Sequence, residues 1–127
     1  MKTISNIIAL TSLFSYQVAV GDSAKTTENK CSGKPVVEIV IFNVNKGVTN
    51  KEVQFASKNI MPDIKKLKGF ESRELVTNKE GKWVDIVHWS SLESALTASQ
   101  LMMKNQKALS FFSLIDQNSM SMMHLCK

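Results

Sequence analysis

Two histidines and two cysteines are all that this 127-residue sequence contains of these residue types, and they form no cluster with the spacing of a metal site. A glycine-rich phosphate loop is missing, as is the order of serine, histidine and aspartate that a catalytic triad requires. The sequence therefore lends no support to a metal centre, to nucleotide binding through a phosphate loop or to triad-based hydrolysis. We expect a protein that uses neither a metal ion nor an organic cofactor.

The features that accompany nucleic-acid binding are also lacking. The net charge is +5, but the lysines are scattered apart from the short run Lys65, Lys66 and Lys68. No recognition helix, finger spacing or aromatic and basic surface goes with them. We interpret the lysines as a solvated basic surface and expect no nucleic-acid partner.

The first twenty-one residues carry almost no charge. Lys2 is followed by a mostly apolar run that reaches Asp22 without another charged residue. The run is short for a membrane span, and Ala19 and Gly21 occupy the −3 and −1 positions of a signal-peptidase site. We predict a signal peptide at residues 1–21, a polar linker at 22–34 and a periplasmic or secreted domain without a stable membrane span. An uncleaved membrane anchor is the alternative.

The rest of the sequence alternates strand-like and helix-like patterns. Residues 36–44 are β-rich and apolar, which is typical of a strand. Thr49 and Glu52 form a capping box, and apolar residues at steps of three and four then predict a helix that Gly69 ends. Pro62 lies inside this pattern, so we expect a kink or a break there.

The second half continues the alternation. Residues 70–77 and 82–89 predict two strands joined by the turn "NKEG", with the charged first strand at a sheet edge. Ser90 and Glu93 form a second capping box and predict an amphipathic helix. A short helix at 107–115 and a strand at 119–126 complete the chain.

The predicted order is strand, helix, strand, strand, helix, strand. This order is that of the ferredoxin-like α+β fold, βαββαβ with an antiparallel sheet, and the domain covers residues 35–127. The last strand of that fold lies antiparallel beside the first, so the end of one is next to the beginning of the other. We therefore predict a disulfide between Cys31 and Cys126 in an exported protein.

Both sides of the first and third predicted strands are apolar. Residues 36–42 contain one polar side chain, Glu38, and residues 83–89 contain the charged or ionisable pair Asp85 and His88. A sheet with helices on one face is usually polar on the other, and a monomer would expose an apolar sheet face to water. We predict a homodimer that packs sheet to sheet as a dimeric α+β barrel.

The segments "VEIVIFNVNKGV", "GFESREL", "GKWVDIVHWSSLESA" and "FFSLID" resemble, in this order, the antibiotic-biosynthesis-monooxygenase-like (ABM) family of the dimeric α+β barrel superfamily. The resemblance spans residues 36–125, and its most specific part is residues 89–95. It implies the fold, the dimer and a ligand site between the sheet and the helices. It says little about chemistry, because the superfamily includes cofactor-free oxygenases, haem degraders and isomerases.

The family's functional residues do not carry over. The asparagine and tryptophan of the haem degraders fall at Val40 and Ser99, and their histidine has no counterpart near Ala108. The second helix also lacks the histidines of the quinol-type members. Haem degradation is therefore not implied.

Four ionisable residues in the predicted strands are candidate catalytic groups: Glu38, Asp85, His88 and His124. Strand alternation puts Asp85 on one face and His88 on the other. If the first and third strands pair with matching faces, Glu38 and Asp85 are neighbours, and two close carboxylates raise one pKa and make a proton carrier. His124 could join either face. The alternative is that each carboxylate is held structurally by a lysine, an arginine or a backbone amide.

Five further residues are candidates for ligand binding: Phe42, Trp83, Trp89, Ser99 and Met102. The aromatic residues share strand faces with Glu38 and Asp85, and Ser99 interrupts the apolar stripe of the second helix. Packing in the core is the alternative.

The resemblance implies cofactor-independent monooxygenase-like activity on a small aromatic or apolar compound. The second hypothesis is a periplasmic module that binds a small hydrophobic ligand without turnover, and the third is a dimer with an interaction role only. The missing second-helix residues favour binding, whereas the family favours an oxygenase.

Overall fold

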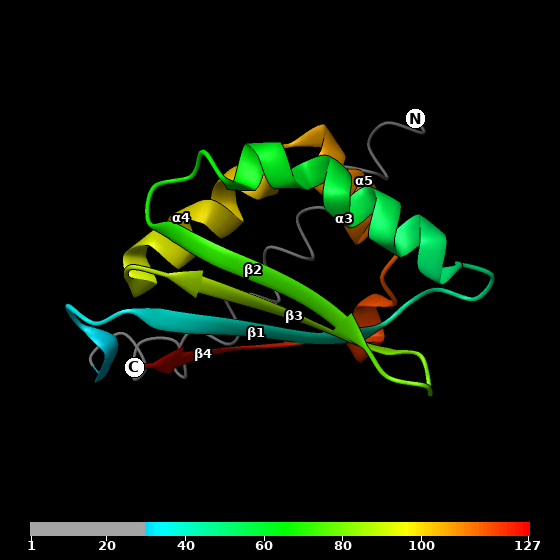
Figure 1. Cartoon of the computed structure of the whole chain (residues 1–127), viewed down its shortest axis with the longest axis horizontal. Coiled ribbons are helices and arrows are strands. Elements are labelled where there is room, and N and C mark those ends of the chain that lie inside the picture. Colours follow the sequence, from blue (N-terminus) through cyan, green and yellow to red (C-terminus); the bar gives the residue numbers. More distant parts are fainter. Residues whose placement is uncertain (1–29) are drawn as a thin grey trace, which may run out of the picture. The chain divides into compact units, whose positions relative to one another are not determined.

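The computed structural model describes residues 30–127, so the predicted signal peptide and most of the predicted linker lie outside the described residues. The elements, in chain order, are β1 (Val36–Asn43), α3 (Asn50–Ile64), β2 (Phe70–Thr77), β3 (Lys82–Trp89), α4 (Leu92–Met102), α5 (Gln106–Phe112), the 3-10 helix η1 (Gln117–Ser119) and β4 (Ser121–Cys126). The strands form an antiparallel sheet in the order β2-β3-β1-β4, and α3, α4 and α5 lie over one of its faces (Figure 1). The predicted ferredoxin-like α+β fold is confirmed.

Helix α3 begins at the predicted capping box. The Thr49 hydroxyl accepts the backbone N–H of Glu52, and the Glu52 carboxylate accepts the backbone N–H of Thr49. The helix does not break at Pro62 but continues to Ile64. Pro62 stands in the last turn, where a missing N–H removes one backbone hydrogen bond and leaves the earlier turns intact.

Helix α4 begins one residue later than the sequence predicted. Its N-cap is Ser91, whose hydroxyl accepts the backbone N–H of Ser94, and not Ser90. The backbone N–H of Ser90 instead donates to the carbonyl of Gly69 at 2.8 Å. Gly69 has a φ of +81°, and a Cβ there would overlap the side chains of Ser90 and Ser94, so glycine is required at this contact.

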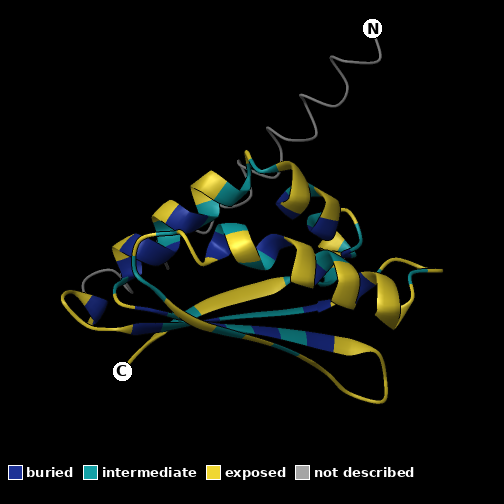
Figure 2. Ribbon diagram, turned by 45° about the horizontal axis from the view of Figure 1, so that its top comes forward, coloured by how far each residue is buried: buried dark blue, intermediate teal, exposed yellow. Residues whose placement is uncertain are grey.

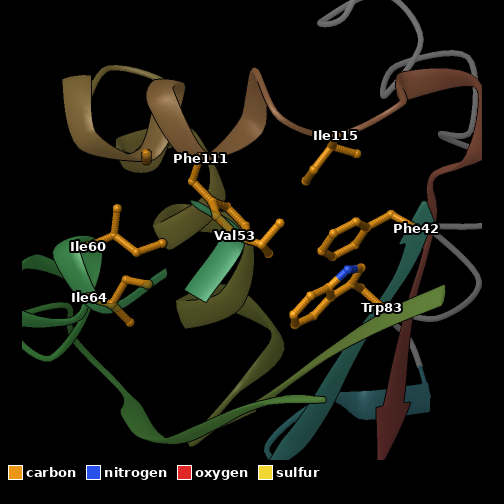
Figure 3. Close-up of a cluster of buried hydrophobic side chains, with 8 residues drawn as sticks. Phe42, Val53, Ile60, Ile64, Trp83, Phe111 and Ile115 are labelled. Carbon is orange, nitrogen blue, oxygen red and sulfur yellow. The ribbon is translucent and has the colours of Figure 1, made fainter. Parts of the chain in front are cut away.

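The core consists of two apolar clusters at opposite ends of the sheet's helix-facing side. The α3–α5 cluster joins residues of these two helices to the strands (Figure 3), and comprises Phe42, Val53, Ile60, Ile64, Trp83, Ala108, Phe111 and Ile115. The α4 cluster comprises Cys31, Val36, Val87, Trp89, Leu92, Ala95 and Ala98. Most of the buried residues lie on the central strands β1 and β3 and on the helices, whereas the edge strands β2 and β4 are mostly exposed (Figure 2).

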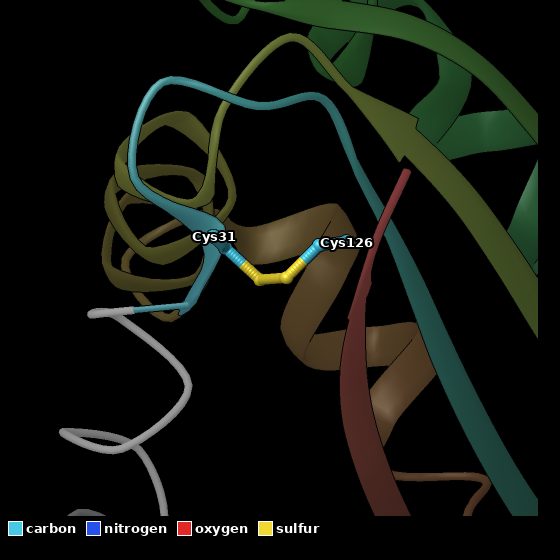
Figure 4. Close-up of a disulfide and its surroundings, with 2 residues drawn as sticks. All are labelled: Cys31 and Cys126. Atoms are coloured by element: carbon cyan, nitrogen blue, oxygen red, sulfur yellow. A yellow bond between two sulfur atoms is a disulfide. The ribbon is translucent and has the colours of Figure 1, made fainter.

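The predicted disulfide between Cys31 and Cys126 is present, with 5.2 Å between the two Cα atoms (Figure 4). Cys31 is buried in the α4 cluster, and Cys126 is the last residue of β4. The register places Cys126 opposite Val36 at the start of β1, as the antiparallel pairing of the first and last strands predicted.

Candidate functional site

Four charged or ionisable side chains lie in a row across the helix-facing side of the sheet. They are Arg73 on β2, Asp85 on β3, Glu38 on β1 and His124 on β4, and we call them the charged row. The register brings them together, because Glu38 is opposite both His124 and Val87, and Val87 is opposite Arg73. Asp85 stands two residues before Val87 on β3, so their side chains lie on the same face of the sheet.

Arg73 and Asp85 form a buried ion pair. The Nε atom of Arg73 donates to both carboxylate oxygens of Asp85 at 2.9 and 3.1 Å, and Nη2 donates to Oδ2 at 2.7 Å. A further guanidinium nitrogen donates to the carbonyl of Ser57 on α3, and the guanidinium lies 5.5 Å from the ring centre of Phe111. These contacts hold the arginine between the sheet and the helices, where its side chain is 3% exposed.

Burial raises the pKa of Asp85 above the ordinary carboxyl value of 3.8. The hydrogen bonds and charge of Arg73 oppose this rise, and the nearby negative charge of Glu38 adds to it. Loss of contact with water disfavours the charged form of a carboxyl group, and a nearby charge of the same sign has the same effect. The predicted proximity of the Glu38 and Asp85 carboxylates is therefore present, with Asp85 as the group whose pKa is raised.

Glu38 and His124 form the second pair of the charged row. The Nε2 atom of His124 lies 2.7 Å from Oε2 of Glu38, and their side chains are 13% and 9% exposed. The pair lies between β1 and the edge strand β4. A histidine beside a carboxylate is a common arrangement for accepting a proton and passing it on.

The charged row occupies the middle of the helix-facing side, between the two apolar clusters. Along β1, Val36 belongs to the α4 cluster and Phe42 to the α3–α5 cluster, with Glu38 and Val40 between them. Val40 is only partly buried although it lies on the central strand and faces the helices. Val40 is therefore less completely covered than the cluster residues on either side of it.

Two buried indole N–H groups flank the charged row along β3. Nε1 of Trp83 and Nε1 of Trp89 have no hydrogen-bond partner among the described residues. The two residues are six positions apart, which is about 20 Å along a strand. One small molecule therefore cannot reach both indoles, and they belong to different ends of the core.

The structure brings three of the four candidate catalytic residues together and separates the fourth. Glu38, Asp85 and His124 lie on the helix-facing side, whereas His88 lies on the outer side, opposite Val37 of β1. This separation agrees with the strand alternation of the sequence. His88 cannot take part in the same site within one chain.

The candidate ligand-binding residues fall into different regions. Phe42 and Trp83 belong to the α3–α5 cluster, and Met102 on α4 packs against it. Trp89 belongs to the α4 cluster and packs edge-on against Phe70. Ser99 is a partly buried residue of α4.

Arg73 was not among the residues selected from the sequence. A signal for it exists, because Arg73 is the single arginine among 16 basic residues of a lysine-rich chain. Arginine binds a carboxylate in two places at once and tolerates burial better than lysine. A lone arginine that shares a strand face with Leu75 is thus a candidate partner for a buried acid.

No helix among residues 30–127 is both long and apolar enough to cross a membrane. The same part of the chain contains no group of three or more His, Cys, Asp or Glu side chains that could hold a metal ion.

The chain has the fold of the ABM-type proteins. SnoaB from Streptomyces nogalater, a cofactor-independent oxygenase, is similar with a TM-score of 0.62 and 14% sequence identity over 74% of this chain and 93% of SnoaB. A protein of the antibiotic biosynthesis monooxygenase type from Caulobacter crescentus has a TM-score of 0.65 and 11% identity, over 80% of this chain and 97% of that protein.

The likeness is one of structure and not of sequence. No protein-family model and no curated protein matches the sequence. A conserved protein from Methanosarcina mazei Go1 is also similar, with a TM-score of 0.62 and 11% identity over 76% of this chain and 95% of the other. The resemblance stated from the sequence motifs is thus confirmed for the fold, while a shared fold leaves the chemistry to the site residues.

Proposed function

We propose that this chain is an exported, homodimeric ABM-like domain that oxidises a small aromatic compound with dioxygen and without a cofactor. The observation that carries this proposal is the charged row on the helix-facing side of the sheet. Charged groups are costly to bury, yet this row lies between the two apolar clusters that form the core. A row of ionisable groups beside aromatic side chains suits a small hydroxylated aromatic compound.

The Glu38–His124 pair is the proposed proton acceptor. A quinol bound beside it loses a hydroxyl proton to the pair, and the resulting anion is rich enough in electrons to react with dioxygen. One quinol and one dioxygen then give a hydroxyquinone and water, so no external reductant is needed. Arg73 and Asp85 act as the fixed neighbours that set the charge around Glu38.

Export is proposed from two observations. The first twenty-one residues have the composition of a signal peptide, and the two cysteines form a disulfide, which persists in an oxidising compartment. Mass spectrometry of the mature protein tests the proposal, because cleavage after Gly21 leaves Asp22 as the first residue.

The homodimer is proposed from the outer face of the sheet. This face presents apolar side chains from three strands, which are Val37, Ile39 and Ile41 of β1, Val84 and Ile86 of β3, and Met123 and Leu125 of β4. Leu125 is 48% exposed and Met123 is 40% exposed. A second copy packed sheet to sheet covers such a face.

Oxygen uptake in the presence of quinols tests the reaction. We expect turnover by the wild type and a loss of about 100-fold in kcat in Glu38→Gln and His124→Gln, the usual contribution of a proton-transferring group. His88→Gln is the matched control, because it removes the other histidine from the opposite face. Equal activity of the wild type and His124→Gln would remove the proposed role of the pair.

A binding module without turnover is the second candidate function. It is favoured by the pairing within the charged row, where Arg73 binds Asp85 and His124 binds Glu38, so each charge already has a partner. Calorimetric binding of an aromatic ligand without oxygen uptake would support this candidate over the oxygenase.

A further inference from the structure

Strand β4, which carries His124, is held by fewer contacts than β1, which carries Glu38. β4 is an edge strand with one sheet neighbour, β1, along residues Ser121–Cys126. Five of its six residues are exposed, and the side chains of Met122, Met123 and Leu125 are at least 40% exposed. Elements with few buried contacts and an open edge unfold locally at low cost.

The disulfide attaches the end of this strand to the core. Cys126 ends β4, and its partner Cys31 is 1% exposed and packs in the α4 cluster with Trp89 and Ala95. Figure 4 shows the bond joining the segment before β1 to the end of β4. Directly after the bond, the backbone N–H of Lys127 donates to the carbonyl of Pro35 at 3.0 Å.

His124 lies close to this attachment. It is two residues before Cys126 on the same, helix-facing side of β4, about 6.6 Å along the strand. Glu38, its partner, lies on the central strand β1 and is fixed by sheet pairing on both sides. The distance of 2.7 Å between them therefore depends on the position of the end of β4.

We propose that the Cys31–Cys126 disulfide positions His124 against Glu38, so that oxidation of the two cysteines assembles the proton-accepting pair. This inference rests on the proposed function of that pair. In the reduced protein the end of β4 separates from β1, and His124 moves away from Glu38. Glu38 then remains on β1 near Asp85 without its histidine partner. The site is then complete only after the chain reaches an oxidising compartment.

The redox step balances within the two cysteines and one oxidant. Each thiol gives up a proton and an electron as the sulfur–sulfur bond forms. A disulfide oxidant, either a small molecule or a protein, accepts the two electrons and two protons and becomes two thiols. Reduction by a phosphine or dithiol reagent reverses the step in the test tube.

Hydrogen exchange and histidine NMR on the mature protein test the coupling without any activity. On reduction we expect the amides of His124 and Leu125 to exchange at least about tenfold faster, while the amides of β2, the other edge strand, change little. The ring signals of His124 shift, whereas those of His88 on the outer face stay the same. The double variant Cys31→Ser/Cys126→Ser behaves like the reduced protein.

Ile60→Val is the matched control for general destabilisation. It weakens the α3–α5 cluster and leaves β4 untouched, so we expect unchanged His124 signals. If reduction accelerates exchange equally in β2 and β4, or leaves the ring signals of His124 where they were, the bond is a general structural link and the inference is wrong.

Oxygen uptake separates this inference from the proposed function. A fall of kcat on reduction that reoxidation restores is the result expected if both hold. If even the oxidised wild type consumes no oxygen with quinols, the oxygenase proposal fails, and the exchange and histidine measurements still decide whether the bond positions His124.

Discussion

The two faces of the sheet both depart from the usual arrangement of side chains. A sheet covered by helices on one face is ordinarily apolar on the covered side and polar on the other. Here the covered side contains Glu38, Asp85, Arg73 and His124 near its centre. The uncovered side presents an apolar surface in its middle, with Ile39 directly opposite Ile86.

The charged row of the covered face and the apolar surface of the uncovered face are therefore each suited to something other than the stability of an isolated chain. Buried charges are weak evidence of stabilisation, because apolar replacements of similar volume are often as stable. An exposed apolar face is a cost until a partner covers it. The covered face fits a reaction or binding site, and the uncovered face fits a second copy of the chain.

The largest expected effect comes from breaking the buried ion pair on the covered face. Asp85→Ala leaves the guanidinium of Arg73, which is 3% exposed, without its partner. We expect a loss of about 3–5 kcal/mol in the free energy of unfolding, measured by urea denaturation. Arg73→Leu/Asp85→Leu should recover most of the loss, because neither charge then remains unpaired.

Glu74→Ala is the control for this pair, since Glu74 is an exposed residue on the outer side of the same strand as Arg73. Its effect should stay within about 0.5 kcal/mol. A loss below about 1 kcal/mol in Asp85→Ala would mean that water reaches the ion pair freely. Burial of these charges would then cost the covered face little free energy.

The next effect concerns the uncovered face. Ile86→Lys places a charge at the centre of the proposed dimer interface and should raise the dimer dissociation constant by at least about 100-fold, equivalent to about 2.7 kcal/mol. Sedimentation equilibrium measures it. Gln54→Lys on the exposed side of α3 adds the same charge away from the sheet and should leave the dimer intact. A wild-type chain that is monomeric at micromolar concentration would contradict the interface.

The fold was predictable because it depends on local patterns. The capping box at Thr49, the alternation of residues 83–89 and the turn at 78–81 each use only neighbouring residues. The start of α4 at Ser91 was not predictable, because a contact with Gly69, distant in the sequence, uses the backbone N–H of Ser90. A capping pattern contains only neighbouring residues and therefore cannot predict such a distant contact.

The candidate site was predictable in part for the same reason. Strand alternation separated Asp85 from His88, and the proximity of Glu38 and Asp85 was predicted on the condition that the first and third strands pair with matching faces, which they do. The partners were not predictable, since the pairing of His124 with Glu38 depends on the register of β4, and that of Arg73 with Asp85 on the register of β2. A one-residue slip in either register would have moved these side chains to the other face.

A smaller effect tests whether the Glu38–His124 pair influences the Arg73–Asp85 pair on the covered face. The negative charge of Glu38 is one of the causes that raise the pKa of Asp85, so Glu38→Gln should lower that pKa, as measured by carboxyl carbon NMR. A native pKa above the unfolded one adds stability that is present below the unfolded pKa and is lost as the pH rises through the native pKa. Because Glu38→Gln lowers the native pKa of Asp85, this stabilising contribution should be lost at a lower pH in the variant than in the wild type.

The stability cost of Glu38→Gln should be about 1–2 kcal/mol, because glutamine retains a hydrogen bond with His124. Glu74→Gln on the outer face is the control and should leave the Asp85 titration unchanged. If Asp85 titrates identically in Glu38→Gln and the wild type, the two carboxylates do not sense each other across the row.

The smallest expected effect concerns the one histidine of the uncovered face. His88 lies opposite Val37 on β1 and Ser72 on β2, within the face that the proposed dimer covers. Burying an imidazole in an interface costs free energy unless it finds a hydrogen-bond partner there. We expect His88→Leu to tighten the dimer by about threefold to tenfold, which corresponds to about 1 kcal/mol, and to leave the Glu38–His124 pair unchanged. Weaker association of His88→Leu would instead show that the partner chain supplies His88 with a hydrogen bond, and the uncovered face would then hold a polar contact of its own.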